Sequence, residues 1–163
     1  MRHALGIALL LALLTAAPAG GHAPTSVSPD PWATVNVCDT TEHPNQMGIR
    51  GGMPGLARRT AMHMRFRVQF RDRSGRWRLI ARGADSGRQR VAAGRRGEHD
   101  AGWTFEFMPP ASGGAHVLRG VVVFEWRRGR RVLERVREVT EAGHPGTAGA
   151  EPEDFSAATC EIA

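Results

Sequence analysis

The chain reads Met62-His63-Met64-Arg65-Phe66-Arg67-Val68-Gln69-Phe70 near its middle, with an apolar side chain at every even position and a polar one at every odd position. Alternation with a period of two residues is typical of a strand that buries one face. After the polar segment 71–75, Arg76-Trp77-Arg78-Leu79 resumes the pattern, so the two runs predict a β-hairpin. We expect Trp77 and Leu79 to face the core.

Two further segments favour strands. Aromatic residues at 103, 105 and 107 alternate with polar ones until Pro109-Pro110 interrupts the pattern. The segment 116–126 is rich in β-forming residues, and a strand there would place on one face Leu118, Gly120, Val122, Phe124 and Trp126.

The segment 130–140 fits two structures. Its apolar residues fall at helical spacing, and Glu134 and Glu138 could pair with arginines on a helix. However, the segment directly follows the predicted tight turn 127–130, is rich in β-branched residues, and lacks an N-cap residue. We therefore predict a strand and keep the helix as the alternative.

The remaining segments predict short terminal strands and connections. Residues 32–38 and 155–162 have the composition of strands, whereas 44–57 is dense in Gly and Pro and is expected to be a link. Residues 82–100 predict a long exposed loop in which only Val91-Ala92-Ala93 could form an edge strand, and 142–154 predicts another connection. The fold class expected is all-β, an antiparallel immunoglobulin-like sandwich in one domain over 32–163, with a small β-barrel as the alternative.

The N-terminus has the three-part order of a signal peptide. Met1-Arg2-His3 is followed by an apolar run over 4–14 and small residues over 15–23. Cleavage is expected near Ala19 or Ala23, with 24–31 as a flexible mature N-terminus. The apolar run is shorter than the ~20 residues that a transmembrane helix needs. We therefore expect signal peptide 1–23, a secreted or extracytoplasmic product and no stable membrane anchor after cleavage.

The two cysteines, Cys38 and Cys160, lie near opposite ends of the predicted domain. Cysteines in exported proteins commonly pair, so we predict a disulfide between them, with two free buried thiols as the alternative.

Arginine supplies all 22 basic residues, and 20 of them lie between residues 58 and 137. The strand pattern turns several outward, where like charges on neighbouring strands repel unless acids or an external polyanion lie among them. An anionic cell-wall polymer is one candidate partner, and a solvated face is the alternative. Specific nucleic-acid binding is not favoured, because the tryptophans fall on predicted core faces. The candidate contacts are Arg65, Arg67, Arg76, Arg78, Arg119, Arg127, Arg128, Arg130 and Arg131.

Motifs for catalysis or metal binding are weak. The chain has no Gly-x-Ser-x-Gly sequence, and its histidines are scattered. Met62-His63-Met64 contains soft ligands that suit copper, but a strand points His63 away from both methionines. We predict no catalytic, metal or cofactor-binding residues and a protein that is not an enzyme.

Several short motifs resemble a group of short exported proteins of high-GC soil bacteria to which no activity is assigned. The resemblance covers nearly the whole mature chain and implies an exported β fold with structural apolar and cysteine positions. The motifs are Trp32-Ala33-Thr34-Val35-Asn36-Val37-Cys38-Asp39, Arg65-Phe66-Arg67, Gly102-Trp103, Leu118-Arg119-Gly120, Phe124 with Trp126, and Phe155-Ser156 with Thr159-Cys160.

These observations leave three functional hypotheses. The first is an exported, non-enzymatic module acting in adhesion, scaffolding or ligand contact. The second is an arginine-rich binder of anionic cell-wall polymer or polysaccharide. The third is a small exported metal-binding protein or enzyme.

Overall fold

The computed structural model describes residues 30–56, 59–94, 96–111 and 113–163. The predicted signal peptide, 1–23, and most of the segment 24–31 lie outside these residues. The described part consists of strands and connections without a helix, so none there could cross a membrane. The strands are β1 (Trp32–Cys38), β2 (Gln46–Pro54), β3 (Thr60–Arg71), β4 (Trp77–Leu79), β5 (Gln89–Gly94), β6 (Glu98–Glu106), β7 (His116–Arg128), β8 (Arg131–Val139) and β9 (Cys160–Ile162).

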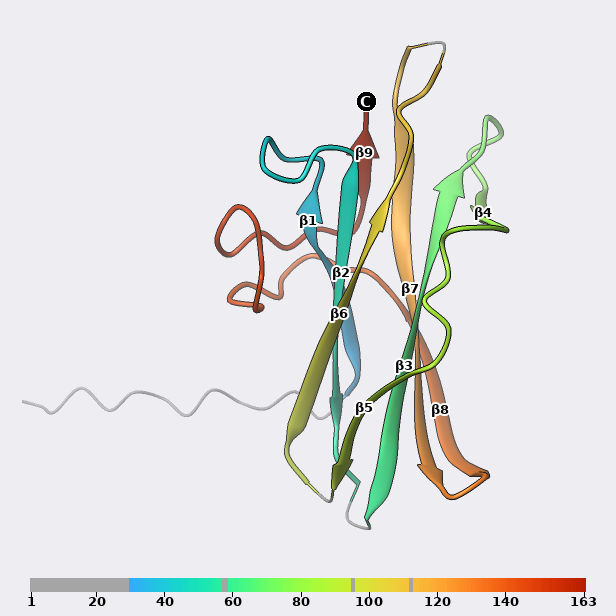
Figure 1. Ribbon diagram of the computed structural model, residues 1–163, viewed down its shortest axis with the longest axis vertical. Helices are drawn as coiled ribbons and strands as arrows, with labels where there is room; N and C mark the ends of the chain where they lie inside the picture. Colours follow the sequence, from blue (N-terminus) through green and yellow to red (C-terminus); the bar gives the residue numbers. More distant parts are fainter. Residues whose placement is uncertain (1–29, 57–58, 95, 112) are drawn as a thin grey trace, which may run out of the picture.

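The strands form two antiparallel sheets in a sandwich-like arrangement (Figure 1). The smaller sheet has the order β1-β2-β6, and the larger has β4-β3-β7-β8, with β5 also pairing with β3 and β9 with β7. The prediction of an all-β antiparallel fold is therefore confirmed, and 131–139 is a strand instead of a helix.

The core lies between the sheets and takes residues from both. Phe66 of β3 and Phe124 and Trp126 of β7 are fully buried, together with Met47 and Ile49 of β2. The Trp126 Nε1 donates a hydrogen bond of 2.7 Å to the Pro54 carbonyl oxygen, which ties the larger sheet to the end of β2. The alternation of residues 62–68 and 118–126 therefore builds the larger sheet's half of the core, as predicted.

The predicted disulfide is present. Cys38 ends β1 in one sheet and Cys160 begins β9 in the other, and their sulfur atoms are bonded across a separation of 122 residues. The bond joins the two sheets directly and closes nearly the whole folded chain into one loop.

The prediction that 44–57 is a link was wrong, because β2 occupies most of it as the central strand of the smaller sheet. Glycine lowers strand propensity when it is judged locally. In this strand, however, a Cβ on Gly52 would lie 2.3 Å from the indole of Trp32, and one on Gly48 would lie 2.8 Å from the Asn36 side chain. Close approach of β1 requires these glycines.

The segment 82–100 is also more ordered than a loop. β5 is longer than the edge strand expected at 91–93, and β6 begins at Glu98. Hydrogen bonds to β3 and β2, which are distant in sequence, supply the pairing that the polar composition did not indicate.

The prediction that Trp77 and Leu79 face the core was wrong. The hairpin register pairs Gln69 with Leu79 and Arg71 with Trp77, which places both apolar residues on the outward face. Leu79 is 41% exposed, and Trp103, also expected in the core, is 39% exposed on the edge strand β6. The turn over residues 72–76 sets this register, and alternation within each strand does not reveal it.

Candidate functional site

The outward face of the larger sheet gathers the odd-numbered residues of β3, β7 and β8. Directly paired residues of antiparallel strands lie on the same face. The cross-strand rows on this face are His63 with Glu125 and Arg135, Arg65 with Val123 and Arg137, and Arg67 with Val121 and Val139. Val123 on the central strand thus lies between arginines of the two flanking strands, whereas Val121 lies between Arg67 and Val139.

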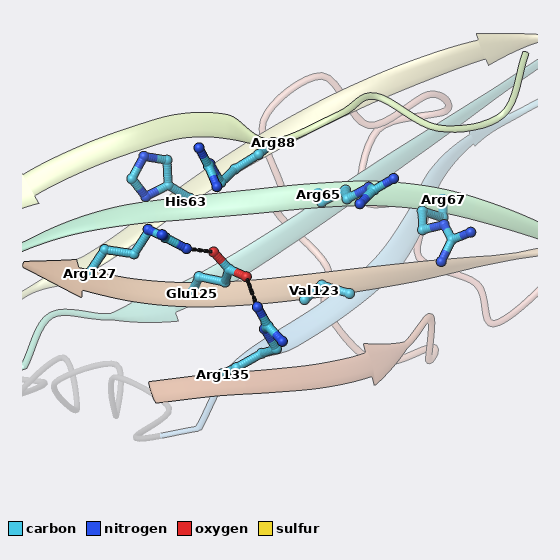
Figure 2. Close-up of a pocket in the computed structure, with 8 residues that line it drawn as sticks. All are labelled: His63, Arg65, Arg67, Arg88, Val123, Glu125, Arg127 and Arg135. Carbon is cyan, nitrogen blue, oxygen red and sulfur yellow. Dashed lines mark hydrogen bonds and ion pairs between the residues drawn. The ribbon is translucent and has the colours of Figure 1, made fainter. Parts of the chain in front are cut away.

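A depression of about 400 Å³ lies over these rows (Figure 2). Its walls come from β3, β7, β8 and the segment that precedes β5. Five of its lining residues are arginines and one is a carboxylate: the full set is His63, Arg65, Arg67, Arg88, Val123, Glu125, Arg127 and Arg135.

Glu125 lies at the centre of this depression and is nearly buried. Its Oε2 accepts a hydrogen bond of 2.7 Å from Arg127, and its Oε1 accepts bonds of 2.9 and 2.6 Å from Arg135. Burial acts to raise the pKa of Glu125, but these two arginines outweigh burial and hold the pKa below its usual value. Glu125 therefore remains ionised and orients two of the five arginines.

Asp85 orients two more arginines from the rim. Its carboxylate accepts a hydrogen bond of 2.7 Å from Arg65 Nε and lies 3.3 Å from Arg67 Nε. The hydrogen bond from Arg65 is the main cause that lowers the pKa of Asp85. The acid that relieves repulsion between these arginines thus comes from the loop before β5. The sequence analysis required either such an acid or an external polyanion.

A second depression, of about 230 Å³, adjoins the first and shares Arg127 with it. No acidic residue is among those that line it, and the side chains of Arg59 and Arg90 make no ion pair within the part of the chain that the structure describes. We call the two depressions together the arginine face. Its arginines are Arg59, Arg65, Arg67, Arg88, Arg90, Arg127, Arg128 and Arg135.

The structure divides the arginines that the sequence singled out. Arg65, Arg67, Arg127 and Arg128 lie on the arginine face. Arg130 lies in the turn between β7 and β8 and Arg131 begins β8; both are exposed and lie outside both linings.

Arg76, Arg78 and Arg119 also lie outside both depressions. Arg78 pairs with Phe70, on the face of the sheet opposite to that of Arg65, and it forms an ion pair of 3.1 Å with Asp72 in the hairpin turn. Arg76 is within 4.0 Å of the same carboxylate. The guanidinium of Arg119 lies 4.4 Å from the centre of the Trp77 ring in a cation–π contact.

Sequence reasoning missed four arginines of the site, namely Arg59, Arg88, Arg90 and Arg135. Three of them had a usable signal. Arg88 and Arg90 are spaced two apart before an apolar run, and such spacing puts side chains on one face of a strand. Arg135 follows from extending the alternation of β8. Arg59 had no such signal.

The histidines do not converge. His43 pairs with Glu151 at 3.0 Å, His144 stacks on Trp32 with ring centres 4.7 Å apart, and His63 lies on the arginine face. Within the described ranges, no three His, Cys, Asp or Glu side chains lie close enough to hold a metal ion. Met62 and Met64 are fully buried on the face opposite to His63.

The arginine face thus brings together eight arginines and one carboxylate from four separate parts of the chain. A comparison with protein-family models and with curated proteins found no match to this chain.

Proposed function

We propose that the protein is an exported immunoglobulin-like module that binds an anionic cell-wall polymer or polysaccharide through the arginine face. The observation that carries the proposal is the ratio of charges: eight arginines line two adjoining depressions that contain one carboxylate. The disulfide and the signal-like residues 1–23 support export, because disulfides persist in oxidising compartments. Binding of such a polymer is the second of the three hypotheses that the sequence left open.

The arrangement of the arginines favours a chain of repeating charges over a single small anion. Residues two apart on a strand are separated by about 7 Å on the same face. Arg65 and Arg67 on β3 repeat at this spacing, and Arg88 and Arg90 lie two residues apart where β5 begins. No aromatic side chain that could stack on a base lines either depression, apart from His63. The face therefore suits the charges of a polymer better than nucleobases.

Arg88→Gln combined with Arg90→Gln tests the arginine face. Neither side chain forms an ion pair in the described part of the chain, so the double variant removes two charges without leaving an acid unpaired. We expect its affinity for heparin or isolated cell wall to fall at least about tenfold at fixed salt, because each charge-assisted contact contributes about 1.5 kcal/mol or more.

The matched control is Arg73→Gln combined with Arg82→Gln. Both residues are exposed in loops outside the two depressions, and the change in net charge is the same. The control should retain most of its affinity. Equal losses in the two double variants would show that net charge, and not the arginine face, controls retention.

Glu125→Gln is expected to change stability and binding in opposite directions. The amide cannot hold Arg127 and Arg135 as the carboxylate does, so we expect the free energy of unfolding to fall by about 1–2 kcal/mol. Loss of the only lining carboxylate should also move elution from heparin to higher salt. Glu134→Gln, an exposed change of equal charge on β8, is the control. Earlier elution of the Glu125 variant would contradict the placement of the polymer over this residue.

A further inference from the structure

Three cationic or potentially cationic side chains converge at the end of the larger depression beside β5. His63 comes from β3, Arg88 from the segment before β5, and Arg127 from β7 (Figure 2). We infer that this end is a discrete subsite for one sulfate-ester or phosphate-ester group, contacted by protonated His63, Arg88 and Arg127. This inference rests on the proposed function and names the charged group that the polymer would carry.

The three donors favour a group with three free oxygen atoms. Arg88 has all its donors available within the described part of the chain. Arg127 uses Nη1 for Glu125 and Nη2 for the Arg130 carbonyl oxygen, which leaves further N–H groups. Because the donors come from three separate segments, each can approach a different oxygen. A terminal sulfate or phosphate ester offers three such oxygens, whereas a carboxylate offers two.

The side chains around His63 carry more positive than negative charge. Arg65 is its neighbour on the same face of β3, Arg90 pairs with it on β5, and Glu125 lies opposite on β7. Arg135 on β8 lies beyond Glu125. Glu125 accepts hydrogen bonds from Arg127 and Arg135 and so offsets part of the charge of Arg127, whereas Arg88 and Arg90 form no ion pair in the described part of the chain.

Protonation of His63 links binding to pH. Burial lowers the pKa of His63, and the charges of Arg88 and Arg127 lower it further, so the free ring is neutral at neutral pH. A bound anion favours the charged ring and raises that pKa. Binding therefore takes up a proton, and affinity increases as the pH falls toward the pKa of free His63. The pKa values of Glu125 and Asp85 are lowered by their arginine partners, so these carboxylates do not take up the proton in place of His63 at neutral pH.

Titration of the folded protein with inorganic sulfate tests the subsite, with the His63 ring followed by NMR at constant ionic strength. Sulfate keeps both charges between pH 5.5 and 8, whereas a phosphate ester titrates near pH 6. We expect sulfate, but not acetate, to move the midpoint of the His63 titration upward, and sulfate affinity to be about tenfold higher at pH 5.5 than at pH 8. An unchanged midpoint, or an equal response to acetate, would overturn the inference.

Two variants separate the roles of the donors. His63→Gln should keep the weaker affinity seen at pH 8 and lose its dependence on pH, and Arg88→Gln should weaken sulfate binding at both pH values. Arg82→Gln, outside the depressions, should do neither. A pH dependence that survives in His63→Gln would assign it to another group and refute the role of His63.

The esters themselves distinguish the two sources of the group. Methyl sulfate and methyl phosphate, compared at pH 8, show which ester the subsite prefers, and equal binding supports recognition of the shared oxyanion. Failure of both to bind would overturn the subsite. If the protein binds heparin or cell wall but sulfate does not bind at His63, the subsite is refuted and the proposed function stands. If sulfate binds at His63 but neither polymer binds, the proposed function is refuted and the subsite stands.

Discussion

Replacing Cys38 and Cys160 together with alanine is expected to lower the free energy of unfolding by about 4–5 kcal/mol. The bond closes a loop of 122 residues, and a loop of this length loses much conformational entropy in the unfolded chain when it is cross-linked. It also joins β1 of one sheet to β9 of the other, so its loss removes the covalent link between the sheets.

Urea unfolding of the oxidised protein and of the double variant measures this difference. The control is addition of a reducing agent to both proteins. Reduction should lower the unfolding midpoint of the oxidised protein toward that of the variant and should leave the variant unchanged. Equal midpoints for the oxidised protein and the variant would contradict the stabilising role of the bond.

Phe66→Ala is expected to destabilise the protein by about 3–5 kcal/mol, the cost of a large cavity in a packed core. Phe66 is on the inward face of β3 and is 0% exposed. Phe70 lies four residues further along the same strand and is 37% exposed, so Phe70→Ala is a control with the same change in side chain. We expect this control to cost about 1 kcal/mol.

Thermal and urea unfolding of the two variants compare an enclosed phenylalanine with a partly exposed one. Both retain the charges of the arginine face, so heparin retention of the folded protein should be unchanged in each. Similar losses of stability in the two variants would mean that the core extends to Phe70 at the end of β3, which would contradict the partial exposure of Phe70.

Strand positions were predictable wherever alternation was strong. Residues 62–70 and 116–126 became the two central strands of the larger sheet, because period-two burial is a local property of an extended chain. β2 was not predictable in this way. Its glycines are required by Trp32 and Asn36 of a neighbouring strand, and no local pattern contains that information.

The candidate site was likewise predictable only where it depends on alternation within one strand. The outward direction of Arg65 and Arg67 could be read from alternation alone, and the structure places both on the arginine face. The exclusion of Arg78 could not, because it depends on the register that the turn at 72–76 imposes. Arg88 and Arg90 joined the face only through the pairing of β5 with β3.

The sequence by itself determined that the strongly alternating segments are extended, which side chains of β3 and β7 are buried, and that Cys38 and Cys160 could pair, since these follow from local periodicity and from a count of two cysteines. Only the tertiary structure decided which arginines meet and which acids lie among them. The physical reason is that charge interactions depend on distance in space, and strand register brings Glu125 to Arg135 and Asp85 to Arg65 across stretches of chain that carry no signal of that contact.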